Sequence, residues 1–302
     1  MEEKVVKELE EYGLLEKDIP FKSLTSFRIG GIAKYVIYPN SYFSLRSILD
    51  IAIDEWIDYK IFGNGTNILC SDDDYDGLII KLTRNLNEYY FDDEYLYAQA
   101  GCSIISLAYK ALDNDLSGLE FASGIPGSLG GCIYMNAGAY KSDMSDIVEE
   151  VSVIDNGKLK TITKEECEFG YRSSIFQDTG MIIVSVKMKL HKDDHENIRL
   201  LMEQRKQRRM ESQPLDYPSA GSTFRNFDDM FAWQIIDNIG YRGRQIGGAA
   251  VSEKHSNFII NKGNATAADV NRLIKEISDL AYEKYGKTMI PEVEKFNWKE
   301  EN

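Results

Sequence analysis

Hydrophobic and polar positions along this chain follow two patterns in turn, one with a helical period and one typical of strands. Three segments of the first half repeat apolar residues every three or four positions, at residues 2–15, 42–54 and 103–113. Short apolar runs lie between the helical segments and predict strands, at residues 33–39, 59–62, 77–82 and 95–101. Helices that alternate with short strands in this way predict an α+β fold.

The middle of the chain contains a clear hairpin pattern. Two runs of alternating apolar and polar residues are joined by Asn156-Gly157, a dipeptide typical of a two-residue β-turn. Thr163 and Glu166 then have the spacing of a capping box, and residues 181–190 predict a buried strand. We therefore expect an antiparallel hairpin that leads into a central strand.

A change of composition near Lys192 suggests a domain boundary. A charged helix, residues 195–210, begins just after it and leads into a segment rich in proline, serine and glycine. At 302 residues the chain is long enough for two well-buried cores. We expect a first domain at residues 1–193, with the N-terminal helix on its outside, and a second domain at residues 194–302.

The last third combines short helices and strands. Thr266 and Asp269 form a possible capping box before a helix whose apolar residues keep a clean period up to Gly286. Pro291 cannot donate to a central ladder, so the tail resembles an edge strand. The remaining predictions are a helix at residues 229–238, a loop rich in glycine at 243–248 and a strand at 257–261.

Charge and hydropathy exclude several classes of function. The net charge of −14 repels nucleic acid and anionic lipid, so we expect neither as a partner. No apolar run is long enough to span a bilayer, and the start of the chain is a charged amphipathic helix rather than a signal peptide. These features predict a cytoplasmic protein without membrane insertion. The sequence carries no signal for an oligomeric state.

The cysteines and histidines do not indicate a metal site. The four cysteines lie far apart and form no CxxC pair, which fits reduced thiols in the core, at Cys70, Cys102, Cys132 and Cys167. His191 and His195 have an i, i+4 spacing, but they flank acidic residues at the end of a predicted strand, where a ligand helix is not expected. We therefore predict no metal.

Two segments rich in glycine are the candidates for ligand binding. Residues 124–140 contain five glycines, so this segment is either a surface turn or a backbone that approaches a large ligand closely. Residues 63–67, GNGTN, follow a predicted strand and could turn several N–H groups towards a diphosphate. Neither segment matches the GxGxxG fingerprint or a P-loop, which excludes both of those nucleotide sites.

Six ordered motifs, from about residue 25 to about residue 296, closely resemble the UDP-N-acetylenolpyruvoylglucosamine reductase family, also called the UDP-N-acetylmuramate dehydrogenases. They are GNGTN, GIPGSLGGCIYMNAGAY, YRSSIF, PSAGSTFRN, SEKHSNFIIN and PEV. The resemblance implies an α+β architecture: an FAD-binding domain of the vanillyl-alcohol-oxidase (PCMH) type with two subdomains, then an α+β substrate-binding domain. The short interval from Arg172 to Ser222 resembles the family's shorter form, without an inserted tyrosine-bearing loop. Arg225, Phe227 and Asn297 depart from the usual pattern.

The resemblance also implies the chemistry. NADPH would be the co-substrate, non-covalent FAD the cofactor and the enolpyruvyl ether of a UDP-sugar the group reduced. Neither glycine segment contains a histidine that could tether the flavin covalently. The residues that the resemblance assigns to FAD are Gly63, Asn64, Gly65, Thr66, Asn67, Gly124, Pro126, Gly127, Ser128, Gly131, Asn136, Ala137 and Gly138.

Five further residues receive roles by resemblance. Arg172 would hold the substrate carboxylate, Glu292 would assist the enolic intermediate, and Ser222 would donate the proton. Arg225 and Asn226 would contact the diphosphate and sugar of the substrate. By composition alone the first three would be a surface arginine, an edge-strand glutamate and a turn serine. We expect a structural role for the histidine of SEKHSNF.

Two other functions remain compatible with the residues. The first is an FAD-dependent oxidase or dehydrogenase of the same fold that acts on an alcohol or a hydroxy acid. The second is a nucleotide-binding sensor without turnover. A purified protein that is yellow and is bleached by NADPH would exclude the sensor.

Overall fold

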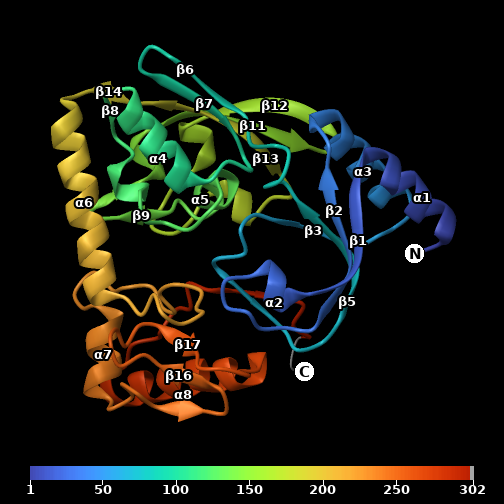
Figure 1. Ribbon diagram of the computed structural model, residues 1–302. Coiled ribbons are helices and arrows are strands. Elements are labelled where there is room, and N and C mark those ends of the chain that lie inside the picture. Colours follow the sequence, from blue (N-terminus) through green and yellow to red (C-terminus); the bar gives the residue numbers. More distant parts are fainter. Residues whose placement is uncertain (300–302) are drawn as a thin grey trace. The chain divides into compact units, whose positions relative to one another are not determined.

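The computed structural model describes residues 1–299, and its contacts divide the chain into two compact units (Figure 1). The first unit comprises residues 1–17, 35–64 and 76–207. The second comprises residues 18–34 and 65–75 together with the chain from Arg208 onward. Each unit has its own hydrophobic core, and the two cores share no residue.

A five-stranded antiparallel sheet forms much of the first unit. Its strand order is β12-β11-β13-β7-β6, with bounds Lys158–Thr163, Val148–Asp155, Ile182–Lys189, Tyr95–Gln99 and Tyr89–Asp92. Burial alternates along β7, as expected for a strand with one face on the core. Helices α4 (Ile104–Asp113) and α5 (Leu129–Tyr134) add buried residues to the same core.

The predicted hairpin is confirmed in its register and its turn. Asp155 pairs with Lys158, so the loop has two residues. Asn156 and Gly157 have φ angles of 49° and 72°, and positive φ at both positions is what a type I′ turn requires. The capping box that follows is also present: the Thr163 N–H donates to Glu166 Oε2 at 2.7 Å.

A four-stranded sheet has the order β1-β2-β5-β3, with bounds Gly13–Pro20, Ile32–Pro39, Tyr75–Lys81 and Tyr59–Phe62. Helices α1 (Glu3–Tyr12) and α3 (Tyr42–Asp54) lie side by side (Figure 1). The prediction of a helix over residues 2–15 was wrong at its end, because Gly13 begins β1. A Cβ at Gly13 would lie 2.4 Å from Tyr38 O, so the strand runs close to the backbone of β2.

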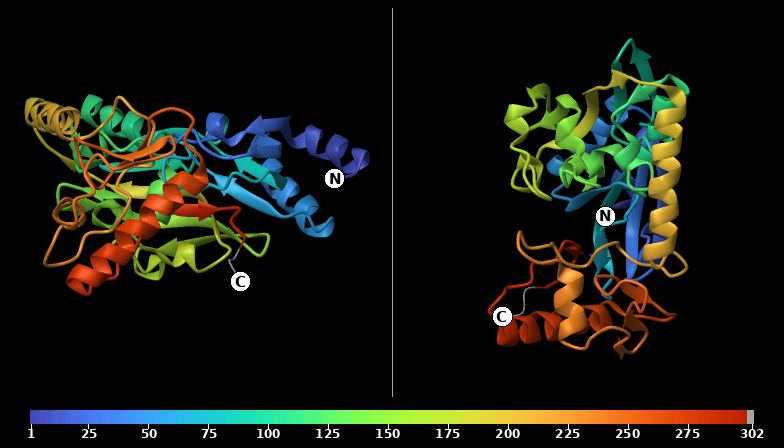
Figure 2. Two further views of the ribbon diagram at one scale, coloured as in Figure 1. Left: turned by 90° about the horizontal axis from the view of Figure 1, so that it is seen from below. Right: turned by 90° about the vertical axis from the view of Figure 1, so that its left-hand side faces the viewer.

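The other elements of the first unit are short. They are β8 (Leu116–Ser117), β9 (Gly138–Ala139), β10 (Ser142–Asp143), β14 (His191–Lys192) and 3₁₀ turns at Glu120–Ala122, Met144–Asp146, Glu165–Cys167 and Ile175–Gln177. The charged helix α6 (His195–Ser212) begins where it was predicted and has two buried residues, Ile198 and Met202. Figure 2 shows α6 as one continuous helix.

The second unit is built around α8 (Ala267–Tyr285), which packs against the strands β15 and β16 (Figure 1). The antiparallel order is β15-β16-β17, with bounds Gln245–Ile246, Ala249–Val251 and Ile259–Asn261. Both ends of α8 follow the prediction: Thr266 and Asp269 form a capping box, and Gly286 has φ 61°. The expected loop at 243–248 instead contains β15.

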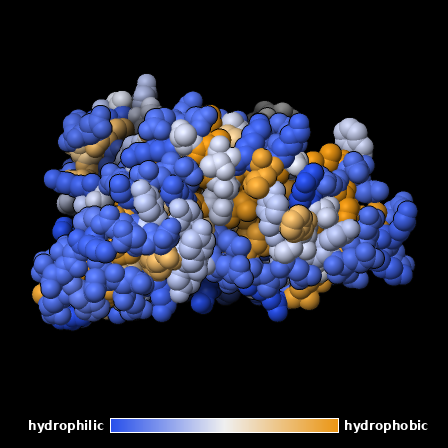
Figure 3. All heavy atoms as spheres, turned by 90° about the horizontal axis from the view of Figure 1, so that it is seen from above, coloured by the Kyte–Doolittle hydropathy of each residue, from blue (hydrophilic) through white to orange (hydrophobic). Residues whose placement is uncertain are grey.

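Segments from the first quarter of the chain complete this unit. Phe27, Ile29 and Leu69 belong to the same core as α8 and α7 (Ala232–Asn238). The tail strand β18 (Glu294–Phe296) pairs in parallel with β4 (Ile68–Cys70). The short helix α2 (Phe21–Leu24) precedes Phe27. Hydrophilic side chains dominate the surface seen in Figure 3.

Candidate active site

The start of the first glycine segment, Gly63 and Asn64, meets the second glycine segment within the first unit. Residues 124–140 fold around the short helix α5, with Ser128 at its N-cap position. The Asn64 side chain donates from Nδ2 to Pro126 O at 3.2 Å. A Cβ at Gly63 would lie 2.1 Å from Ser128 Oγ, so the two segments touch here, and any side chain at residue 63 would require the Ser128 hydroxyl to shift. The structure therefore brings Gly63, Asn64, Pro126 and Ser128 together, and their contact with FAD stays a prediction.

The glycines differ in what surrounds them. A Cβ at Gly127 would lie 2.8 Å from Cys132 Sγ, and one at Gly65, where φ is 65°, would lie 2.3 Å from Leu24 O. The protein's own packing therefore requires glycine at residue 65, whereas a side chain at residue 127 would require the Cys132 thiol to shift. Gly131 is exposed on α5, and the atom nearest to a Cβ there is Ser128 Oγ at 3.5 Å. Gly131 thus leaves open backbone that a large planar ligand can approach, and this fits FAD.

Lys81 is a buried cation next to Gly63 of the first glycine segment, and no sequence motif predicted it. Its side chain is 9% exposed, and Nζ donates to Gly63 O at 2.9 Å. Burial lowers the pKa of Lys81 to about 8. The signal in the sequence was a lysine at the end of an otherwise apolar strand, next to the motif GNGTN in space but not along the chain.

Arg172 lies beside the end of the second glycine segment. Its guanidinium donates from Nη2 to Gly138 O at 2.7 Å and from Nη1 to Asn136 O at 3.5 Å. Arg172 has φ 56°, a left-handed conformation that is uncommon for a residue with a side chain and is often found at functional sites. The Asn136 side chain in turn donates to Gly170 O at 2.9 Å. The segment that carries Asn136 and the segment that carries Arg172 therefore hold each other in place.

The YRSSIF segment is also attached to α5 itself. Ser174 Oγ and Gln177 Nε2 both donate to Tyr134 O, at 2.7 and 2.9 Å. Tyr134 is the last residue of α5, at the end where a helix offers its final carbonyls to donors outside the helix. The segment that carries Arg172 therefore satisfies the end of the helix that carries Gly131.

In the second unit, two extended segments carry Ser222 and Glu292. The Glu292 N–H donates to Thr223 O at 2.8 Å, and the Arg225 N–H donates to Ile290 O at 2.9 Å. Phe224 and Pro291 form the antiparallel bridge between these bonds. Ser222, next to Thr223, is thus brought to the same short ladder as Glu292.

Some predicted ligand residues make structural hydrogen bonds here. Asn67 was assigned to the cofactor, and its Nδ2 donates to Glu292 O at 3.0 Å. Asn226 was assigned to the substrate, and its Oδ1 accepts from the Ala232 N–H at 3.0 Å, at the first residue of α7. The side chains of both residues therefore support local structure.

The predicted residues divide between the two compact units. Gly63 and Asn64 belong to the first unit, whereas Gly65, Thr66 and Asn67 belong to the second. Arg172 lies in the first unit, and Ser222 and Glu292 lie in the second. Gly124, Ala137 and the other residues assigned to the second glycine segment all belong to the first unit.

His255 is held by its neighbours, in line with the structural role expected for it. Its Nδ1 accepts from the Asn257 N–H at 3.3 Å, and its ring packs edge-on against Phe258, with centroids 5.0 Å apart. Burial, and then the nearby charge of Arg242, lower the pKa of His255.

The cysteines are free and buried. Burial raises the pKa of Cys132 to about 12, so its thiol stays protonated near neutral pH. Within residues 1–299, no group of three or more His, Cys, Asp or Glu side chains is placed to hold a metal ion. Among the same residues, no helix is long and apolar enough to cross a bilayer.

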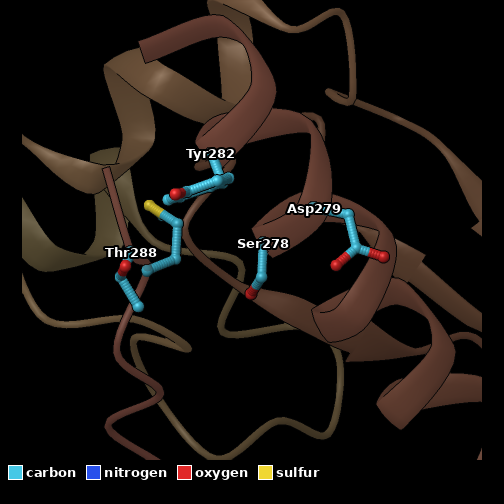
Figure 4. A pocket seen from close by; sticks show the side chains of 5 residues that line it. Ser278, Asp279, Tyr282 and Thr288 are labelled. Carbon is cyan, nitrogen blue, oxygen red and sulfur yellow. The ribbon is translucent and has the colours of Figure 1, made fainter. Parts of the chain in front are cut away.

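A surface hollow of about 400 Å³ lies beside the end of α8 (Figure 4). It is lined by Ser278, Asp279, Tyr282, Thr288 and Met289. Asp279 forms an ion pair with Lys275 at 2.7 Å, and Ser278 Oγ donates to Ile274 O at 2.8 Å. None of the residues assigned to cofactor or substrate lines this hollow, so we do not place the active site there.

Comparisons with known proteins find family matches in two parts of the chain. A family profile described as "UDP-N-acetylenolpyruvoylglucosamine reductase, C-terminal domain" matches residues 213–296, and a profile described as "FAD binding domain" matches residues 33–163. The expected α+β architecture, an FAD-binding domain followed by a second domain, is thereby confirmed. The predicted division at residue 193 falls between the two matches and stays a prediction.

Individual relatives extend the match to nearly the whole chain. The UDP-N-acetylenolpyruvoylglucosamine reductase of Caldanaerobacter subterraneus subsp. tengcongensis is 44% identical over 289 residues, which cover 95% of each chain. The crystal structure of the reductase from Thermus caldophilus is similar with a TM-score of 0.82 at 30% identity, over 94% of this chain and 100% of that one. An alkyldihydroxyacetonephosphate synthase structure, 17% identical with a TM-score of 0.50 over 64% of this chain and 41% of that one, shares the fold alone.

Proposed function

This chain belongs to the UDP-N-acetylenolpyruvoylglucosamine reductase family, FAD-dependent oxidoreductases of peptidoglycan precursor synthesis, and we propose that Arg172, Ser222 and Glu292 carry out its chemistry. The substrate is the enolpyruvyl ether of a UDP-sugar, and NADPH is the reductant. One observation carries the assignment of residues: the backbone hydrogen bonds between residues 223–225 and 290–292 bring the segments of Ser222 and Glu292 side by side.

The first unit supplies most of the residues that we assign to the flavin. Gly131 offers open backbone on α5, and Asn64 and Pro126 join the two glycine segments beside it. When bound, FAD supplies the reducing equivalents that it takes from NADPH. Non-covalent binding agrees with the absence of histidine in both glycine segments.

Arg172 provides a fixed positive charge for the substrate carboxylate. Reduction of the double bond at its terminal carbon places negative charge on the neighbouring carbon and on the carboxylate, so a fixed cation stabilises the transition state more than the ground state. The bond from Arg172 to Gly138 O restrains the guanidinium before substrate arrives. Such preorganisation lowers the cost of binding the developing anion.

Ser222 donates the proton that completes the reduction. A serine hydroxyl is a weak acid, but a carbanion is a much stronger base, so a well-placed hydroxyl can protonate it if the alkoxide is reprotonated promptly. Glu292 lies on the adjacent segment and assists the enolic intermediate by hydrogen bonding. Arg225 and Asn226 lie three and four residues after Ser222, and we assign them to the nucleotide part of the substrate.

The test is anaerobic oxidation of NADPH by the purified yellow protein, with and without UDP-N-acetylglucosamine enolpyruvate. We expect one rapid equivalent of NADPH oxidised without substrate, matching the flavin content, and continued turnover when substrate is added. Turnover supported by an alcohol or a hydroxy acid, and not by the enolpyruvyl compound, would contradict the proposal. The proposal places the reaction in the cytoplasm, where NADPH and nucleotide sugars are made.

A further inference from the structure

The peptide that follows Ser222 is held on both of its edges. On one edge, Thr223 O accepts from the Glu292 N–H, as described above. On the other edge, the Thr223 N–H donates to Asn257 O at 2.7 Å, and Thr223 Oγ1 accepts from the Ile259 N–H at 3.2 Å. Thr223 is 5% exposed, so these bonds are shielded from water. Residue 223 therefore has little freedom to move relative to either edge.

The side chain of Asn257 fixes the next residue completely. The Phe224 N–H donates to Asn257 Oδ1 at 3.0 Å, and Asn257 Nδ2 donates to Phe224 O at 2.8 Å. A neutral primary amide can accept and donate in one plane, which a carboxylate or a hydroxyl of similar size cannot do in the same way. Asn257 is 3% exposed, and Phe224 is 1% exposed within the core. The amide thus joins the core of the second unit to the segment that carries the proposed proton donor.

Ser222 lies just before the two residues, Thr223 and Phe224, that these hydrogen bonds hold in place. Gly221, just before it, has φ 82°, and no atom lies within 4 Å of the place where its Cβ would be. The glycine is therefore needed for its backbone conformation and not for lack of space. Gly221 makes a left-handed turn before Ser222, and the hydrogen bonds of Asn257 hold the chain after it. The direction of the Ser222 side chain therefore depends on how firmly residues 223 and 224 are held.

We propose that Asn257 is a positioning residue: its amide clamps Phe224 and thereby orients Ser222 for proton transfer. The inference rests on the proposed role of Ser222 as proton donor. General acid catalysis requires the donor within hydrogen-bond reach of the reacting atom, and a displacement of about 1 Å can slow a reaction by about 10²-fold. A residue without any contact to substrate can therefore control the rate of protonation.

The experiment compares Asn257→Ala with a matched control, Asn261→Ala. Asn261 is a buried amide on β17 whose side chain also binds backbone through both of its polar atoms, to Phe27 O and from the Gly263 N–H, instead of to Phe224. We expect both variants to lose thermal stability and keep their FAD. Only Asn257→Ala should slow reoxidation of the reduced flavin by the enolpyruvyl substrate, by about tenfold or more, while reduction by NADPH stays normal.

A double-mutant cycle separates positioning from general damage. If Asn257 acts through Ser222, Asn257→Ala should cause no further slowing of reoxidation in a Ser222→Ala background. Losses that multiply in the double variant would overturn the inference, and so would equal slowing of both half-reactions in Asn257→Ala. Faster hydrogen exchange at the Phe224 amide is the expected structural signature in Asn257→Ala, and unchanged exchange would also overturn the inference.

A milder variant keeps the inference testable if Asn257→Ala does not fold. Thr223→Val is nearly isosteric and removes only the bond from the Ile259 N–H, so we expect a smaller slowing of the same half-reaction. Normal reoxidation in Thr223→Val would overturn the inference that residues 223 and 224 must be held in place for Ser222 to act. Normal reoxidation in Ser222→Ala would instead overturn the proposed role of Ser222. Slow reoxidation in Ser222→Ala together with normal reoxidation in Asn257→Ala would overturn the inference about Asn257 and leave the proposed role of Ser222 intact.

Discussion

Ser222 is the residue whose proposed role makes the sharpest kinetic prediction. A proton donor acts only after hydride has reached the substrate, so the flavin of Ser222→Ala should be reduced by NADPH at nearly the normal rate. Reoxidation by the enolpyruvyl substrate should slow by ~10²-fold or more, the scale for loss of a positioned general acid. Stopped-flow flavin absorbance measures both halves, and Ser222→Cys should recover part of the rate. Equal slowing of both halves would mean that Ser222 supports the flavin site instead.

Gly131 allows cofactor contact to be separated from packing. Gly131→Ala should raise the stability of the apoprotein by up to about 1 kcal/mol, because alanine favours a helix over glycine. The same methyl group should lower FAD affinity, because it occupies the open backbone that we assign to the cofactor. Flavin content and apoprotein unfolding at matched concentration measure the two effects. Unchanged FAD affinity would show that Gly131 does not touch the cofactor.

Lys81 should make stability depend on pH in the alkaline range. The folded state holds its pKa near 8, below the ordinary value of 10.5, so the unfolded chain binds more protons between these values. Below pH 8 the buried ammonium group therefore lowers the free energy of unfolding by its full amount. The free energy of unfolding should rise as pH increases through 8 towards 10.5. Relative to Lys81→Met, the wild-type free energy of unfolding should gain about 3 kcal/mol over this window.

The pH dependence of Lys81 has a matched control on the neighbouring strand. Lys60 lies on β3 with its side chain exposed, so Lys60→Met should leave the pH profile of the wild type unchanged. Urea unfolding of the apoprotein at several pH values from 7.5 to 10 measures all three proteins. A constant difference between wild type and Lys81→Met across this range would contradict a buried, titrating lysine.

The helices, strands and turns that were predicted well are those whose sequence pattern lies within the element itself. The bounds of α3 and β3, the turn at Asn156-Gly157 and both ends of α8 agree with the sequence, because a cap, a turn dipeptide or a helical period is contained within a few residues. Elements that depend on distant partners were missed. The strand β1 forms because Gly13 can lie against β2, and the glycines of α5 gave no helical signal.

The same distinction applies to the candidate site. The motifs identified the segments that carry Arg172, Ser222 and Glu292, because each motif is continuous in the sequence. The residues that hold these segments are remote: Asn257 lies 33 positions from Phe224, and Lys81 lies 18 positions from Gly63. No period or short motif connects such pairs, so only the folded structure could reveal them.

The cap of α8 provides a prediction at the scale of an element. Thr266 Oγ1 accepts from the Asp269 N–H at 3.1 Å, and the Asp269 carboxylate accepts in return from the Thr266 N–H. Thr266→Ala should lower the free energy of unfolding by about 1 kcal/mol, and Thr266→Ser should lose much less. Chemical denaturation measures both variants. An alanine variant as stable as the wild type would mean that the box adds nothing to this helix.

On the scale of the molecule, the two compact units are interleaved along the chain. The core around α8 includes Phe27, Ile29 and Leu69, which precede the C-terminal region by more than a hundred residues in sequence. The strand β18 pairs with β4, and the Asp72 carboxylate accepts from the Ala267 N–H at 2.8 Å. A cut in the sequence near residue 193 would therefore separate the C-terminal region from part of its own core.

This interleaving predicts how fragments behave. A fragment of residues 194–302 lacks the buried side chains of Phe27, Ile29 and Leu69, and each large buried side chain contributes about 1.5–3 kcal/mol, which together rival the stability of a typical domain. We expect the fragment alone to show no cooperative thermal unfolding by circular dichroism. Co-expression with residues 1–193 should restore a cooperative transition and FAD binding, because the missing segments return. Cooperative unfolding of the isolated fragment would show that the first quarter of the chain is dispensable for this core.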